Sequence, residues 1–262
     1  MLKKTITLSF ILFMIFQAKA QEFKAYEKHL MRLEEQFFPF RLMLPEDYDV
    51  NKKYPLIFFL HGYGERGDDN QLQLVHGARF FQREDVRKDF PAIVVFPQCS
   101  KDSYWSNSME HVKPDGSYAF YFQTGGEPTK AMERAEALLE MILKTYPVDK
   151  SSIYIGGLSM GGMGTFEMVR RNPDTFAAAF PICGGANPAT AENMKTVSWW
   201  IFHGAKDNVV PPHLSEDMAA ALKAAGADVK LTLYPDANHN SWDPAFAEKD
   251  LLKWLFSKSR KE

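Results

Sequence analysis

The sequence has few cysteines, no long apolar run and no block of charge of one sign. Its 262 residues include two cysteines, and the formal net charge is −2 without a basic cluster or an acidic tail. Nucleic acid and acidic membrane surfaces are therefore poor candidates for partners. Low-complexity tracts are also absent, and 45% of the residues are hydrophobic. This composition predicts a globular protein with one sizeable core.

The longest apolar run lies near the N-terminus and is too short to span a bilayer. Ile6–Phe16 has about half of the roughly twenty residues that a transmembrane helix needs. It follows the cationic Met1–Lys4 and precedes the small residues of Ala18–Ala20, which is the layout of a secretory signal cleaved after Ala20. No cysteine follows that would carry a lipid. We expect residues 1–20 to be removed, leaving residues 21–262 as one secreted or periplasmic domain without stable membrane insertion.

Short apolar runs that end at Gly or Pro alternate with helical patterns in the rest of the chain. Such runs are typical of strands buried on both faces of a parallel sheet, and the alternation predicts a doubly wound α/β fold. A further antiparallel strand is expected at the sheet edge, at Pro39–Leu44. The predicted strands are Leu56–Leu60, Ala92–Phe96, Ile153–Ile155, Phe176–Ile182, Ser198–Phe202 and Val229–Tyr234, and the predicted helices are Pro128–Tyr146, Met163–Arg171, Ser215–Ala225 and Ala247–Phe256.

One serine lies between glycines, directly after a predicted strand and before a predicted helix. Gly157-Leu-Ser159-Met-Gly161 matches the pattern G-x-S-x-G, in which a strained turn holds a serine hydroxyl at the carboxyl edge of the sheet. Glycines are needed two residues before and two residues after, because side chains there would clash. We therefore predict that Ser159 is a nucleophile and that the backbone N–H of Met160 faces a developing oxyanion.

A serine hydroxyl is a weak nucleophile and needs a base that is itself held by an acid. With this kind of turn, the acid and then the histidine follow the serine along the chain. Asp207 and His239 each lie just beyond the carboxyl end of a predicted strand, at the edge where ligands bind in open α/β sheets. We predict Asp207 as the acid and His239 as the base, with Asp236 and Asp243 as rival acids.

A glycine-rich loop follows the strand that should lie next to the nucleophile strand. In His61-Gly-Tyr63-Gly-Glu-Arg-Gly67 the glycines let the backbone bend, so that the N–H of Tyr63 can point into the site as a second oxyanion donor. We expect the His61 imidazole to brace this loop rather than to take part in catalysis. No Gly-Lys-Ser/Thr follows, which makes a phosphate-binding loop a weak interpretation.

With these residues in place, the chain resembles the α/β-hydrolase superfamily. More narrowly, it is similar to secreted bacterial esterases of the polyhydroxybutyrate-depolymerase-like and feruloyl/acetylxylan esterase group, including carbohydrate esterase family 1 and proteins described as predicted peptidases. The resemblance implies an α/β-hydrolase fold and the same Ser159, Asp207 and His239. It does not select a substrate. The matching stretches are LHGYGERGDDN, FPQCSKDSYW, IYIGGLSMGGMGTF, FPICGGA, HGAKDNVVP and HNSWDP.

The sequence lacks room for the lid domain that lipases of this fold carry. Cys183–Met194 is only about a dozen residues long, so the cleft should be open and suited to esters on a polymer. The aromatic-rich segment Ser100–Thr129 is expected to form one wall of the cleft. We predict that Tyr104, Trp105 and Trp242 contact substrate by ring stacking, although such rings can equally pack a loop onto the body.

Three classes of function remain open from the sequence. The first is a serine ester hydrolase acting on feruloyl or acetyl esters of plant polysaccharides or on related small esters, with an acyltransferase as a variant. The second is a serine peptidase of the prolyl-oligopeptidase kind, although the large propeller domain usual in that group has no counterpart. The third is a catalytically silent binding module, which the filled triad positions disfavour.

No cluster of His, Cys and Asp has metal-ligand spacing, so we expect no metal and no cofactor. Cys99 and Cys183 should follow strands separated by two others. At about 4.8 Å between neighbouring strands, their Cα atoms would lie beyond the roughly 7 Å that a disulfide allows. We therefore predict two free thiols.

Overall fold

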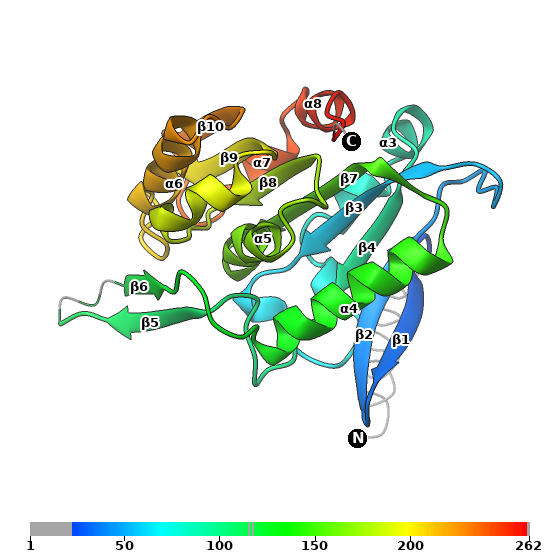
Figure 1. Ribbon diagram of the computed structural model, residues 1–262, viewed down its shortest axis with the longest axis horizontal. Coiled ribbons are helices and arrows are strands. Elements are labelled where there is room, and N and C mark those ends of the chain that lie inside the picture. Colours follow the sequence, from blue (N-terminus) through cyan, green and yellow to red (C-terminus); the bar gives the residue numbers. More distant parts are fainter. Residues whose placement is uncertain (1–22, 115, 117, 261–262) are drawn as a thin grey trace, which may run out of the picture.

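The computed structural model describes residues 23–114, 116 and 118–260, which form an eight-stranded sheet with helices on both faces (Figure 1). The predicted secretory segment lies outside the described residues. The strand order is β1-β2-β4-β3-β7-β8-β9-β10, and the six strands from β4 to β10 run parallel. The strands are β1 (Glu27–Leu33), β2 (Gln36–Met43), β3 (Tyr54–Leu60), β4 (Ile93–Pro97), β7 (Val148–Leu158), β8 (Ala178–Ile182), β9 (Ser198–Gly204) and β10 (Val229–Tyr234).

The N-terminal edge of the sheet differs from the prediction in one respect. The antiparallel strand expected around Pro39–Leu44 is present as β2, but it is not an edge strand. It pairs with β4 on one side and with the outer strand β1 on the other, both antiparallel. The outermost strand β1 has the sequence EKHLMRL, in which charged and apolar residues mix. Such a short mixed run is a weak strand signal on its own. An edge strand with few buried side chains needs no regular pattern of apolar residues.

Two helical layers cover the sheet, and each buries one set of alternating strand residues. Leu56, Phe58 and Leu60 of β3 pack into the cluster on the face of α4, α5 and α6, whereas Ile57 and Phe59 pack into the cluster on the face of α2, α3, α7 and α8. Burial on both faces is the reason for the continuous apolar runs. The helices are α2 (Ala78–Phe81), α3 (Glu84–Asp89), α4 (Lys130–Thr145), α5 (Met160–Arg171), α6 (His213–Ala224), α7 (Trp242–Phe246) and α8 (Leu251–Phe256), with 3₁₀ turns η1 (Tyr63–Glu65), η2 (Leu72–Leu74) and η3 (Pro188–Met194).

The long helix α4 shows how local sequence determines where an element begins and ends. The Thr129 hydroxyl accepts the N–H of Met132 at 3.1 Å and caps the first turn. Pro147 follows the helix closely, and proline cannot continue it. The single helix predicted at Ala247–Phe256 begins only at Leu251, and a separate short helix, α7, precedes it.

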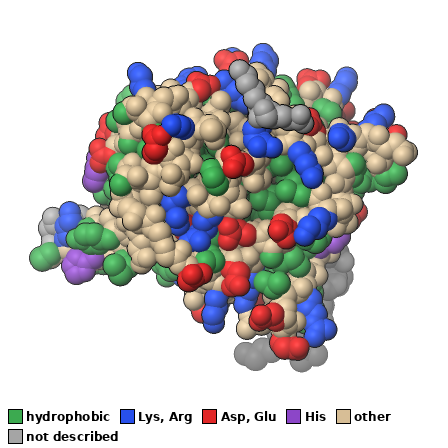
Figure 2. All heavy atoms as spheres, in the orientation of Figure 1, with side chains coloured by type: hydrophobic (Ala, Val, Ile, Leu, Met, Phe, Trp, Pro, Cys, Tyr) green, Lys and Arg blue, Asp and Glu red, His purple; other side chains and the backbone are tan. Residues whose placement is uncertain are grey.

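A two-stranded antiparallel hairpin projects from the body and was not predicted as such (Figure 1). Its strands are β5 (Ser108–Val112) and β6 (Tyr118–Phe122), and they pair only with each other. Apolar side chains remain exposed on the hairpin, including Met109 and Tyr121, and in Figure 2 it extends to the left of the main body.

The helices of the described part of the chain are all too short or too polar to span a bilayer.

Candidate active site

Ser159 lies on a strained turn between β7 and α5, as the sequence predicts. Its φ of 54° and ψ of −119° are unusual for a residue other than glycine, and such strain is found mostly at functional sites. A Cβ atom on Gly157 would lie 2.3 Å from the carbonyl oxygen of Gly161, and one on Gly161 would lie 2.0 Å from the carbonyl oxygen of Leu60. The two glycines are therefore required by the close approach of three backbone segments.

Replacing Gly161 with alanine is expected to destabilise the fold by about 3 kcal/mol or more, since overpacking here displaces backbone rather than a flexible side chain. The midpoint of thermal unfolding should fall by roughly 6–12 °C. Gly125→Ala is the matched control: a Cβ there meets nothing within 4 Å and φ is not positive. That variant should stay within about 0.5 kcal/mol of the parent. Equal unfolding midpoints for the two variants would contradict the packing argument.

The structure brings the three predicted side chains into one hydrogen-bonded chain. Nε2 of His239 lies 2.9 Å from Oγ of Ser159, and Nδ1 of His239 lies 2.8 Å from Oδ2 of Asp207. The Asp207 side chain is fully buried, whereas His239 is partly open to the pocket. The rival acids lie elsewhere: Asp236 pairs with Lys206 at the surface, and Asp243 accepts a hydrogen bond from its neighbour Asn240.

His239 is not the only group that holds the Asp207 carboxylate in the described structure. Its Oδ1 accepts the backbone N–H groups of Val209 and Val210, each at 2.9 Å. Its Oδ2 also lies 3.3 Å from Nε2 of the fully buried His203. Burial alone raises the pKa of Asp207, but hydrogen bonds from His203 and His239 outweigh it and leave the pKa well below its usual range. The carboxylate is therefore ionised and oriented before any substrate arrives.

The loop after β3 lies beside Ser159 and is braced from behind. His61 donates from Nδ1 to the carbonyl of Gly62 at 2.6 Å and accepts the N–H of Cys99 at Nε2, at 3.0 Å. Burial lowers the pKa of His61 to about 4, so the ring is neutral. These bonds confirm that His61 braces the loop. Tyr63 and Met160 each begin a helix, where the first N–H groups have no partner inside the helix, and both residues line the pocket.

The prediction for Trp105 is wrong. Its side chain is 0% exposed and does not line the pocket. The indole N–H donates to the carbonyl of His61 at 3.0 Å, and the ring packs against the imidazole of that residue. It also fills the space beside Gly164 of α5, where a Cβ would lie 2.4 Å from that of the tryptophan. Trp105 therefore supports the loop from the core and does not contact substrate.

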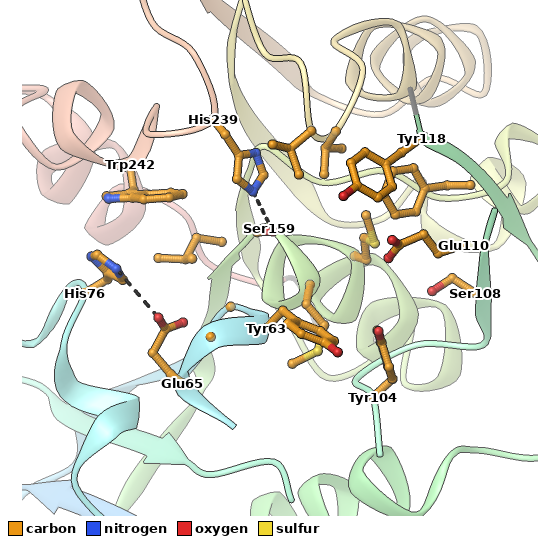
Figure 3. Close-up of a pocket in the computed structure, with 18 residues that line it drawn as sticks. Tyr63, Glu65, His76, Tyr104, Ser108, Glu110, Tyr118, Ser159, His239 and Trp242 are labelled. Carbon is orange, nitrogen blue, oxygen red and sulfur yellow. Dashed lines mark hydrogen bonds and ion pairs between the residues drawn. The ribbon is translucent and has the colours of Figure 1, made fainter. Parts of the chain in front are cut away.

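Ser159 opens into a pocket of about 720 Å³ (Figure 3). The other two predicted contact residues, Tyr104 and Trp242, do line it. They lie at opposite ends, with Ser159 between them (Figure 3). The hairpin forms the wall on the Tyr104 side, as expected for the segment Ser100–Thr129. That end is lined by Tyr104, Ser108, Glu110, Tyr118 and Phe120, and the other end by Glu65, His76 and Trp242.

Tyr63 and Tyr104 form an aromatic pair that is fixed by Arg66. The guanidinium of Arg66 lies 3.6 Å from the centre of the Tyr63 ring and 4.9 Å from that of Tyr104, in cation–π geometry. Arg66 also donates to the carbonyl oxygens of Tyr63 and Ser103. Burial, aided by the neighbouring Tyr63, raises the pKa of Tyr104 to about 12, which keeps its phenol neutral. The two phenol rings therefore present a neutral aromatic face at this end of the pocket, which also contains the Glu110 side chain.

With the geometry established, the family follows from a direct match. The model of the family described as "Putative esterase" matches residues 34–251. The chain belongs to that family. This range includes the strained turn, the helices η1 and α5, and all three members of the hydrogen-bonded chain.

Known proteins of the same fold include several esterases. A thermostable esterase of known structure superposes with a TM-score of 0.80 at 32% identity, over 92% of this chain and 64% of that one. A probable feruloyl esterase C from Aspergillus terreus is 27% identical over 170 residues, which are 65% of this chain and 55% of the relative. A ferulic acid esterase from Anaeromyces mucronatus, solved with ferulic acid, superposes with a TM-score of 0.63 at 15% identity, over 87% and 89%. The fold is that of the α/β-hydrolases.

The chain spans only part of some of these proteins. It covers about 55% of the length of the Aspergillus relative and 64% of the thermostable esterase. The family match concerns the part that carries Ser159, Asp207 and His239.

Several pocket residues were missed by sequence reasoning. Glu110 lies on a hairpin that short, irregular apolar runs did not reveal, although the segment that contains it was expected at the cleft wall. Glu65 belongs to the glycine-rich loop, so its place near the site followed from that loop, but its side chain was not considered. His76 lies in a polar stretch without a strand end, and it reaches the pocket only through a tertiary contact with Trp242.

Both cysteines are free and buried, in agreement with the strand order. Sγ of Cys183 lies close enough to Asp207 and His239 for the three to resemble a ligand cluster. Burial raises the pKa of the Cys183 thiol strongly, and the other two side chains are already hydrogen-bonded to each other. Because a thiol must lose its proton to bind a metal, we do not assign a metal to this group.

Proposed function

We propose that this protein is a carboxylic ester hydrolase that acts through an acyl-enzyme on Ser159. The observation that carries the proposal is the chain of hydrogen bonds from Ser159 to His239 to Asp207, at 2.9 and 2.8 Å, at the edge of a pocket. The family match and the esterases among the known relatives support it. An acceptor nitrogen in direct reach of a serine hydroxyl is the arrangement that nucleophilic acyl transfer needs.

The proposed reaction has two halves with the same groups. His239 takes the proton of Ser159 at Nε2 while Oγ attacks the ester carbonyl, and then gives that proton to the leaving alcohol oxygen. Water then enters, gives a proton to the same nitrogen and attacks the carbonyl carbon of the acyl-enzyme. When the resulting tetrahedral intermediate collapses, Nε2 returns the proton to Oγ of Ser159 and the carboxylic acid leaves. Asp207 accepts the Nδ1–H bond throughout and stabilises the imidazolium that forms twice.

The backbone N–H groups of Tyr63 and Met160 are the proposed oxyanion donors. Tyr63 and Met160 are each the first residue of a helix, and both line the pocket that contains Ser159. Donors of this kind act where charge develops in the transition state, and losing one typically lowers the rate by about two to three orders of magnitude. The bracing of this loop by His61 and Trp105 keeps the Tyr63 N–H in place.

The proposed substrates are feruloyl or acetyl-type esters of plant polysaccharides, or related small esters. Two features support them: the neutral aromatic face at Tyr104 and the relatives named feruloyl esterase. We further propose that residues 21–262 act as one α/β-hydrolase domain after export, with residues 1–20 as the leader. No cofactor enters the proposed mechanism.

A panel of chromogenic substrates tests the proposed function. Purified protein should release nitrophenolate from p-nitrophenyl acetate and hydrolyse methyl ferulate, but release no nitroaniline from peptide p-nitroanilides. The reason is that an amide carbonyl is less reactive than an ester carbonyl and an amine is a poorer leaving group than an alcohol. Amide cleavage therefore needs the extended peptide contacts that a peptidase supplies. A kcat/KM for the anilides above that for both esters would replace the esterase by the serine peptidase.

A further inference from the structure

The end of the pocket opposite the hairpin holds ionisable groups that the proposed mechanism does not use. Nε2 of His76 lies 3.7 Å from a carboxylate oxygen of Glu65, and the His76 ring packs on Trp242 with 4.8 Å between ring centres. Figure 3 shows these three residues together on one side of Ser159. The Glu65 side chain is only 14% exposed, so this carboxylate faces the pocket rather than bulk solvent.

The fold fixes this group of side chains in place. Gly77 has a φ of +85°, and a Cβ on it would lie 2.9 Å from the ring of Phe246, so the turn after His76 packs directly on α7. Phe246 also packs on Phe80 of α2, with 5.3 Å between ring centres. Because α7 begins with Trp242, this contact places Trp242 beside His76.

The position of Trp242 identifies what this end of the pocket would contact. Its ring meets the His239 ring edge to face, with 5.6 Å between centres. In the proposed reaction, His239 gives its proton to the leaving alcohol, so the alcohol must pass next to this ring pair. The opposite end offers the neutral aromatic face of Tyr104 together with Phe120, which suits the acyl part of an aromatic ester.

The chemistry of the group fits a hydroxyl-rich ring. An indole face covers the apolar face of a sugar, while a carboxylate accepts and an imidazole donates or accepts hydrogen bonds from its hydroxyls. The Glu65 carboxylate already accepts the N–H of Gly62 and still faces the pocket. Among the described residues, neither lysine nor arginine lines the pocket, so an anionic sugar would meet no opposite charge there.

We propose that Glu65, His76 and Trp242 form the subsite for the alcohol part of the ester and that this subsite takes a neutral polyhydroxylated alcohol such as a pentose. The proposal rests on the proposed ester hydrolysis and adds which end of the pocket holds the alcohol. These residues act by positioning the alcohol, and none of them transfers the proton.

Two esters of one acid, methyl ferulate and feruloyl arabinose, test the subsite, because they differ only in the alcohol. His76→Phe keeps the ring contact with Trp242 and removes both polar atoms. It should lower kcat/KM for the sugar ester about tenfold through KM, as expected for a lost hydrogen bond, and leave methyl ferulate unchanged. Glu65→Gln keeps the shape of the side chain and removes its charge. This variant should also lower kcat/KM for the sugar ester and leave methyl ferulate hydrolysis unchanged. His111→Phe is the matched control, since His111 is exposed on the hairpin and does not line the pocket. This variant should keep the parent kcat/KM for both esters.

The outcomes separate the subsite from the activity itself. Parallel changes for the two esters in both pocket variants, or no change for the sugar ester, would overturn the subsite and leave the esterase intact. Hydrolysis of neither ester by the unaltered protein would overturn both. Unfolding midpoints equal to that of the parent show that a changed ratio comes from the pocket and not from loss of folded protein.

Discussion

Replacing Ser159 with alanine is expected to lower kcat for p-nitrophenyl acetate by about six orders of magnitude, to the level that an oxyanion hole and binding alone supply. The methyl group cannot form the acyl-enzyme, because the change removes the oxygen that lies 2.9 Å from Nε2 of His239. The change removes one oxygen from a partly open site, so stability should alter little. Initial rates at saturating substrate measure the effect.

Ser257→Ala is the control for the Ser159 variant. Ser257 ends the C-terminal helix α8 and hydrogen-bonds only locally, to the carbonyl of Trp254. Its replacement should leave kcat unchanged. If Ser159→Ala kept the full rate through repeated purification, the esterase would not use this serine, and the proposed function would be wrong.

Replacing Asp207 with asparagine is expected to lower kcat by about four orders of magnitude, with the geometry nearly intact. The amide oxygen would go on accepting the N–H groups of Val209 and Val210, because those bonds are short and buried. The amide nitrogen would then face His239 and turn its ring into the wrong tautomer, with Nδ1 as acceptor. Nε2 would carry the proton and could no longer take one from Ser159.

The two rival acids provide the controls for the Asp207 variant. Asp236→Asn and Asp243→Asn should each retain the parent rate, because Asp236 pairs with Lys206 and Asp243 with Asn240 rather than with His239. A loss in either of these variants comparable to that of Asp207→Asn would show that the hydrogen bond at 2.8 Å is not the one that holds the base.

The elements that carry Ser159, Asp207 and His239 were predictable because their signals are local. Strand β7, the turn at Ser159 and helix α5 follow one another directly in the sequence. The glycines on either side of Ser159 indicate that backbone segments approach closely there, as the structure confirms. Asp207 and His239 each follow a buried parallel strand, and the carboxyl ends of such strands share one edge. Topology therefore brings Asp207 and His239 to Ser159 without any contact being visible in the sequence.

The parts that were missed depend on tertiary contacts. Trp105 and Trp242 look alike in sequence, since each is an aromatic residue in or beside a segment predicted to line the cleft. The first is buried because Gly164 of α5 leaves a space that fits its ring. The second is partly buried and lines the pocket, because α7 docks beside it. The pairing of Glu65 with His76 likewise depends on the contact of Phe246 with the turn at Gly77. No local pattern encodes these distances.

Labelling with diethyl p-nitrophenyl phosphate tests the central claim most directly, because the reagent needs a serine activated by a base and then stays bound. Oγ of Ser159 should form a bond to phosphorus as nitrophenolate leaves. We predict one nitrophenolate per protein, one diethylphosphoryl group on the peptide that contains Ser159, and loss of esterase activity in proportion. A label on another residue, or full activity after complete labelling, would contradict the account.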